Sequence, residues 1–163
     1  MKKLTKILAL LTVIVAFTAA THAQVSATAN ASAVIFTPLT ISSTVDMDFG
    51  TLASAGGGTL VLNLDNTLTP SAGVTVIAGT PTAASFTVTG IIGATYSMTI
   101  PASITLASGA NSMTVDPITD NSTGTLTGGT ETFAVGGTLN VSAAQPAGTY
   151  TNTTDLTVTV NYN

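Results

Sequence analysis

The sequence predicts an all-β protein, a sandwich or barrel built from many short strands. Two observations predict this class. Alternating apolar and polar residues recur in short runs between glycine-rich turns, which is the pattern of half-buried strands. After residue 23, no stretch holds apolar residues at a sustained helical spacing.

The first 23 residues have the three regions of a secretory signal peptide. A start with three lysines precedes an apolar run at residues 7–17, and a small-residue cleavage motif ends at Ala23. The apolar run is too short to cross about 30 Å of hydrocarbon as a helix. We therefore expect residues 1–23 to be removed, which leaves a secreted chain that begins at Gln24.

The predicted secreted chain has no basic side chain, because all three lysines and the single histidine precede residue 24. It has seven acidic residues and no cysteine. Without His, Lys or Cys it has no catalytic triad, no Schiff-base lysine, no thiolate nucleophile and no imidazole or thiolate zinc site. Without Lys or Arg it has no side chain to hold a phosphate backbone. We expect a protein that is not an enzyme, uses no cofactor and binds no nucleic acid.

Acidic residues leave two chemical alternatives open. A glycosidase needs only two carboxylates at a set separation, although this chain has no tryptophan and few other aromatic residues to line a sugar cleft. Asp46 with Asp48, and Asp116 with Asp120, are candidate oxygen ligands for Ca²⁺, but their spacing is not that of an EF-hand. Alternation explains the first pair as outward-facing residues.

The stretch QVSATANASAVI, residues 24–35, is the first to alternate. Its apolar positions begin with Val25, Ala27, Ala29, Ala31 and Ala33. Two interpretations are open: this is the first strand of the chain's own sandwich, or it is a donor strand that packs against another molecule. We treat residues 24–35 as an extension and residues 36–163 as the β-sandwich domain.

Six further segments alternate in the middle of the chain. They are VDMDFGTL (45–52), TLVLNLD (59–65), VTVIA (74–78), ASFTVTG (84–90), ATYSMTIP (94–101) and NSMTVDPI (111–118). In the first, Val45, Met47 and Phe49 are expected to share one face. The segment ETFAVGGTLNV, residues 131–141, predicts a hairpin with its turn at Gly136-Gly137.

The last segment, GTYTNTTDLTVTVNYN, is the most regular one. Its apolar face consists of Tyr150, Leu156, Val158, Val160 and Tyr162. No later segment of the sequence is present to cover the neighbouring edge, so we expect one edge of the sheet to lie open.

Four motifs carry a resemblance to a known family: FGTL (49–52), GGTLNV (136–141), QPAGTY (145–150) and LTVTVNY (156–162). They resemble the secreted bacterial proteins grouped as domain of unknown function 4402, over essentially the whole chain after residue 23. The PAGTY turn, followed by an alternating strand that ends in Tyr162, is also similar to the spore coat protein U group of archaic chaperone-usher pilins. That second resemblance is confined to the C-terminus and the N-terminal strand, and the absence of Cys departs from the disulfide that those relatives usually carry.

The pilin resemblance implies an incomplete immunoglobulin-like sandwich with a hydrophobic groove in place of its final strand. A periplasmic chaperone would fill the groove first, an outer-membrane usher would assemble the subunits, and the extension of the next subunit would replace the chaperone. On this view the donor side is Val25, Ala27, Ala29, Ala31 and Ala33, and the strand bordering the groove carries Leu156, Val158, Val160 and Tyr162.

The sequence therefore predicts a non-enzymatic, secreted structural protein at the cell surface. It is expected to be a fimbrial or other surface-polymer subunit, of the kind used in adhesion, that assembles with copies of itself by donor-strand exchange and does not insert stably into a membrane. The alternative is a monomeric secreted β-sandwich that binds a surface glycan or another ligand.

Overall fold

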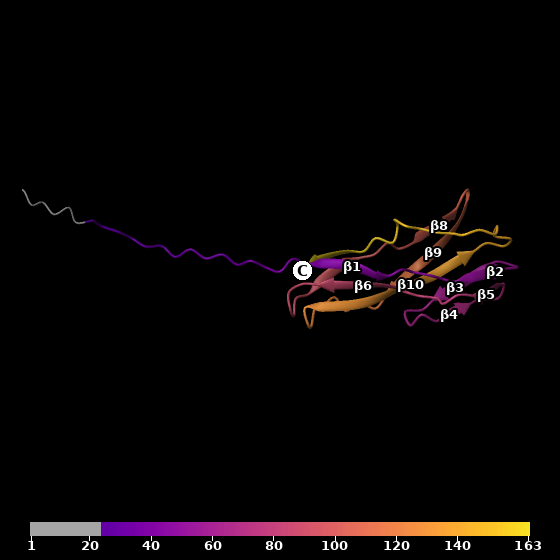
Figure 1. The fold of residues 1–163 in the computed structure, drawn as a ribbon, viewed down its shortest axis with the longest axis horizontal. Helices are drawn as coiled ribbons and strands as arrows, with labels where there is room; N and C mark the ends of the chain where they lie inside the picture. Colours follow the sequence, from indigo (N-terminus) through magenta and orange to yellow (C-terminus); the bar gives the residue numbers. More distant parts are fainter. Residues whose placement is uncertain (1–23) are drawn as a thin grey trace, which may run out of the picture. The chain divides into compact units, whose positions relative to one another are not determined.

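The computed structural model describes residues 24–163, and within them the chain forms eleven β-strands (Figure 1). In chain order they are β1 (Thr40–Val45), β2 (Thr51–Ser54), β3 (Gly58–Leu62), β4 (Leu68–Pro70), β5 (Val74–Ala78), β6 (Ala84–Thr89), β7 (Tyr96–Thr99), β8 (Ile104–Ser108), β9 (Asn111–Asp120), β10 (Thr130–Val141) and β11 (Thr159–Tyr162). The predicted signal peptide, residues 1–23, lies outside the described residues.

The chain divides between Val34 and Ile35 into two units, and the second of these contains all eleven strands. No helix among residues 24–163 has the length and apolar character needed to cross a membrane.

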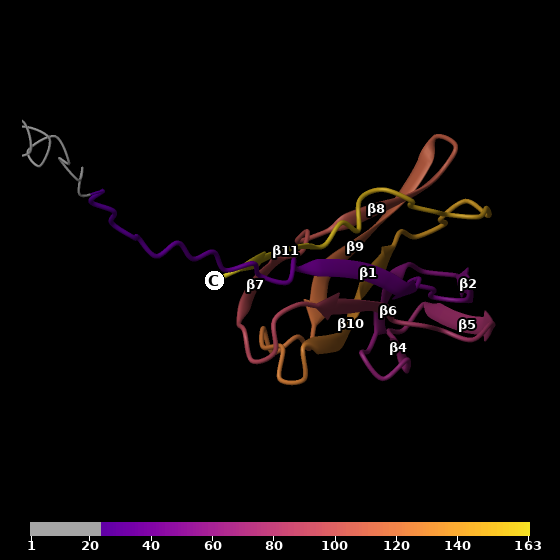
Figure 2. The same ribbon diagram turned by 60° about the vertical axis from the view of Figure 1, so that its left-hand side comes forward.

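The strands pair antiparallel throughout, which confirms the predicted all-β, sandwich-like class. The main sheet has the order β1-β6-β10-β3-β4, with β9 paired to β10 and β8 paired to β9. Two short pairs, β7–β11 and β2–β5, complete the fold (Figure 2). Strands β3, β5, β6, β7 and β9 overlap the alternating segments that the sequence predicts.

The side chains pack into two hydrophobic clusters that lie along β10. The first cluster is built around Leu60, Leu62, Val115 and Leu139, and the second around Phe86, Val88, Phe133 and other side chains. Because Phe133 and Leu139 lie six residues apart on one face of β10, a single strand contributes to both clusters. Phe86 and Phe133 stack with their ring centroids 5.8 Å apart.

The predicted hairpin at Gly136-Gly137 is wrong, because β10 continues through both glycines. Both residues are buried, and neither has the positive φ of a turn glycine. A Cβ at Gly136 would overlap the backbone carbonyl oxygen of Leu62, and one at Gly137 would lie 2.7 Å from Cγ1 of Val115. The glycines therefore allow β3 and β9 to approach β10 closely from its two sides.

The predicted facing of Val45 is wrong, because β1 contains a bulge just before this residue. Ser43 pairs with Phe86, the pairing skips Thr44, and Val45 pairs with Ser85. Cross-strand partners share a face, and Ser85 points away from the core that Phe86 enters. Val45 is therefore on the outer face, whereas Met47 and Phe49 point inward as predicted.

The C-terminal strand is shorter than predicted. Only Thr159–Tyr162 form β11, and Tyr150 lies outside it, next to Thr151, which forms an isolated bridge with Ala107. The hydroxyl of Tyr150 donates to the carbonyl oxygen of Pro146 at 2.8 Å and accepts a hydrogen bond from Nε2 of Gln145 at 2.8 Å.

Candidate functional site

The strands β1 and β11 each have a strand partner on one side only, within the part of the chain that the structure describes. β1 is an end strand of the main sheet and pairs with β6, and β11 pairs with β7. Figures 1 and 2 both show β11 beside the start of β1, and residues of the two strands are in contact. We call the region between these two strand edges the seam.

Apolar side chains line the seam from both edges. The second core cluster has a buried centre that includes Val88, Tyr96 and Phe133. Partly buried residues surround this centre, and those from the two edges are Leu39, Ile41, Leu156, Val158, Val160 and Tyr162. The four C-terminal residues predicted to border a groove thus lie together on one cluster, although only Val160 and Tyr162 belong to β11.

Ser43 shows that the seam is open to solvent. It pairs with Phe86, which is 7 % exposed and belongs to the core. Cross-strand partners share a face, so Ser43 is on the core side of β1. Ser43 is nevertheless exposed. The core side of the sheet is therefore uncovered at this point of the seam.

Tyr162 closes the seam at one end. Its hydroxyl accepts a hydrogen bond from the backbone N–H of Ile91 at 2.9 Å and donates to the carbonyl oxygen of Thr37 at 3.0 Å. A Cβ at Gly90 would overlap this hydroxyl, so the absence of a side chain there gives the tyrosine its place. The end of β11 is thereby tied to the chain just before β1.

The predicted donor residues lie in a stretch that forms no strand. Residues 24–38 are all exposed, and the first strand of the domain begins at Thr40. Local alternation at Val25, Ala27, Ala29, Ala31 and Ala33 therefore does not make this stretch a strand of its own sandwich. Their role as donors remains a prediction.

Sequence reasoning missed Leu39, Ile41 and Ser43 as lining residues of the seam. A signal was present, because Leu39 and Ile41 alternate with threonine and serine. The alternation is interrupted at once by the polar Ser43 and by the bulge, which leaves too short an apolar pattern to indicate a strand.

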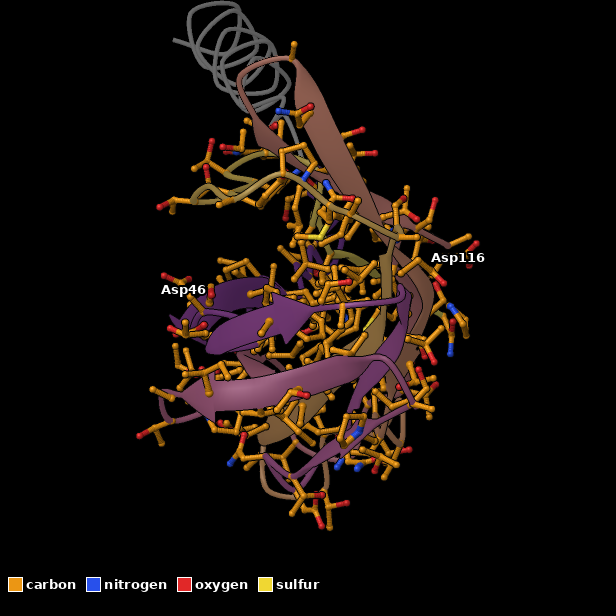
Figure 3. All side chains as sticks on the ribbon, turned by 90° about the vertical axis from the view of Figure 1, so that its right-hand side faces the viewer. Asp46 and Asp116 are labelled. Atoms are coloured by element: carbon orange, nitrogen blue, oxygen red, sulfur yellow. The ribbon has the colours of Figure 1, made fainter. Side chains whose placement is uncertain are left out.

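Asp48 and Asp120 cap turns, and the acidic residues among residues 24–163 do not gather into a metal site. Oδ1 of Asp48 accepts a hydrogen bond from the N–H of Gly50 at 2.7 Å. Oδ1 of Asp120 accepts from the N–H and the hydroxyl of Ser122, at 2.8 and 2.6 Å. Figure 3 shows Asp46 and Asp116 on different sides of the molecule. Residues 24–163 contain no group of three or more His, Cys, Asp or Glu side chains that could hold a metal ion.

Glu131, at the start of β10, is the acidic group with the most hydrogen-bond partners. The hydroxyl of Tyr96 donates to its Oε2 at 2.8 Å, and the N–H groups of Thr123 and Thr125 also donate to the carboxylate. Burial raises the pKa of Glu131, but these hydrogen bonds outweigh burial and hold the pKa below its ordinary value. Burial and the neighbouring Glu131 raise the pKa of Tyr96. The carboxylate thus joins β7, β10 and the loop before β10.

Comparison with known proteins gives one family. A sequence profile described as "Domain of unknown function (DUF4402)" matches residues 39–162, from the residue before β1 to the last residue of β11. The chain matches no curated protein and no solved structure.

Proposed function

The chain belongs to the DUF4402 family, and we propose that it is a secreted, non-enzymatic subunit of a fimbrium or other surface polymer that assembles by donor-strand exchange. In this proposal residues 24–35 of one copy enter the seam of the next copy. The single observation that carries the proposal is the open seam, in which the core-facing Ser43 is exposed between two strand edges.

The lengths of the two predicted partners support the proposal. The lining residues from Leu156 to Tyr162 occupy four alternating positions over seven residues. The alanines from Ala27 to Ala33 also occupy four alternating positions over seven residues. At about 3.3 Å per residue, both stretches span about 20 Å. The two stretches therefore match in length.

The chemistry of the two surfaces also matches. The seam is lined by large side chains, among them Ile41, Val158 and Val160, and alanine is the apolar side chain that needs least space beside them. Each alanine buries little surface, at about 25 cal/mol per Å². Main-chain hydrogen bonds to the strand edge would therefore supply much of the attachment, as in other cases of strand addition.

The proposal extends to the route of assembly. An open apolar seam between two strand edges is a site of unwanted pairing between copies. We propose that residues 1–23 direct export through the inner membrane, that a periplasmic chaperone covers the seam of the free subunit, and that an outer-membrane usher joins subunits at the cell surface. The partner in the finished polymer is a second copy of this chain.

A charge on the inward face of the extension tests the proposal. Ala29→Asp would place a carboxylate in the apolar seam, where its desolvation is unfavourable, so we expect the SDS-resistant oligomers of surface fractions to disappear. Asn30→Asp adds the same charge one residue away, on the outward face, and should leave the oligomers intact. The measurement is a gel in SDS after mild heating. Equal behaviour of the two variants would contradict the proposal.

The alternative function is a monomeric sandwich that binds a surface glycan or another ligand. One observation favours it: a shallow hollow of about 350 Å³ lies over β3, β9 and β10, where Thr59, Thr114 and Asn140 supply polar groups. This hollow contains no aromatic side chain on which a sugar ring could stack, and it does not include the lining residues of the seam. Donor-strand exchange therefore accounts for more of the structure.

A further inference from the structure

Large apolar side chains project into solvent where the predicted donor strand, residues 24–35, ends. Ile35 is 94 % exposed and Phe36 is 70 % exposed. They follow the last donor alanine, Ala33, by two and three residues. Adjacent apolar side chains with this much exposure are available for burial against another molecule.

The seam has two distinct ends. At one end, Tyr162 is hydrogen bonded to Thr37, just before β1 begins. At the other end, Met47 and Leu156 both contact the two core clusters. Because the start of β1 lies beside the end of β11, the two strands run in opposite directions along the seam.

The direction of an incoming strand follows from which edge it pairs with. A strand between β1 and β11 is antiparallel to one of them and parallel to the other, and antiparallel pairing is the more stable. The bulge at Ser43–Val45 interrupts the edge of β1, whereas no irregularity interrupts the pairing of β11. Antiparallel pairing with β11 is therefore favoured, and it brings the end of the donor strand to the Leu156 end of the seam.

The strand direction and the facing of Ile35 and Phe36 together determine which residues these side chains contact. Ile35 has the same phase as the donor alanines, so it points inward, toward Leu156 and Met47. Phe36 has the opposite phase and points outward. At this end of β1 the bulge turns Val45 to the outer face, where it is 42 % exposed.

We propose that Ile35 and Phe36 of one copy form an apolar joint with the copy that receives its extension, Ile35 on Leu156 and Met47, and Phe36 on Val45. This inference rests on the proposed function. The two surfaces of the joint are different, so the contact is head-to-tail and repeats along an open filament. The joint would fix the angle between consecutive copies, which the donor strand alone leaves free.

Cysteine pairs test the joint directly, because the chain has no cysteine of its own. Phe36→Cys and Val45→Cys are made in two differently tagged copies of the full chain, which are expressed together. We expect a disulfide-linked species that carries both tags and disappears on reduction. The control pair is Phe36→Cys with Ile92→Cys, since Ile92 is 75 % exposed and adjoins Ile91 at the Tyr162 end.

Four outcomes separate the joint from the proposed function. A cross-link through Val45→Cys supports the joint. A cross-link through Ile92→Cys instead would show the reverse strand direction and overturn it. SDS-resistant oligomers without a cross-link in either pair would also overturn the joint, while strand exchange would stand. Absence of oligomers in the unaltered protein would overturn the proposed function and the joint with it.

A second variant tests the joint without introducing cysteines. Replacing Ile35 and Phe36 together by serine should lower the temperature at which the oligomers dissociate in SDS. The unfolding of the free subunit should be unchanged, because both side chains are exposed there. An unchanged dissociation temperature would contradict the joint.

Discussion

At the scale of single residues, Glu131 shows how a mostly uncharged protein uses one carboxylate. It accepts hydrogen bonds from Tyr96, Thr123 and Thr125, and its pKa lies below the ordinary value of 4.5. A carboxylate whose pKa is lowered by folding stabilises the fold above its unfolded-state pKa. This contribution is lost as the pH falls through the lower pKa of the folded state.

We predict that Glu131→Gln lowers the free energy of unfolding by about 1–3 kcal/mol at neutral pH, because it removes charge-assisted hydrogen bonds. The difference between the variant and the unaltered protein should shrink as the pH falls below 4.5. Chemical denaturation at a series of pH values measures this. Asp46→Asn, at an exposed site, is the matched control. A difference that is constant with pH would show that the ionised carboxylate is not the stabilising group.

At the scale of strands, the packing of β3 and β9 against β10 depends on Gly136 and Gly137, which lie inside β10 and not in a turn. We predict that Gly136→Ala lowers the free energy of unfolding by about 1–3 kcal/mol, because the new Cβ overlaps the backbone of Leu62 and forces β3 away. Gly128→Ala adds the same atom where no other atom lies within 4 Å, and it should change stability by less than about 0.5 kcal/mol. Thermal or denaturant unfolding compares them. Equal stability of the two variants would mean that β3 can move away from β10 without a loss of free energy of unfolding.

The strands also show what pattern alone can predict. Alternation located β3, β5 and β6, because their inward residues, such as Leu60 and Phe86, are large and regularly spaced. It failed at Gly136-Gly137, because a pair of glycines is equally compatible with a turn and with a crowded strand. It also failed at Val45, where a bulge reverses the facing, since the sequence pattern does not show which strand residue is left unpaired.

At the scale of the whole molecule, the seam is a property of the tertiary structure. The sequence predicted Leu156, Val158, Val160 and Tyr162 as one face of an edge strand, and they do share a cluster. It did not predict that β1 lies opposite them, because the partner of an edge is chosen by the arrangement of the sheets. The open position at Ser43 follows only from the register of β1 with β6.

Donor-strand exchange requires that residues 24–35 of one copy complete the sandwich of another. The most direct test compares surface fractions from cells that make the full chain with fractions from cells that make a chain lacking residues 24–33 but retaining residues 1–23. Both are run on a gel in SDS after mild heating. Strand exchange predicts a ladder of oligomers for the full chain and its loss in the deletion, with the shortened subunit still exported. A lone monomer band from both would contradict strand exchange.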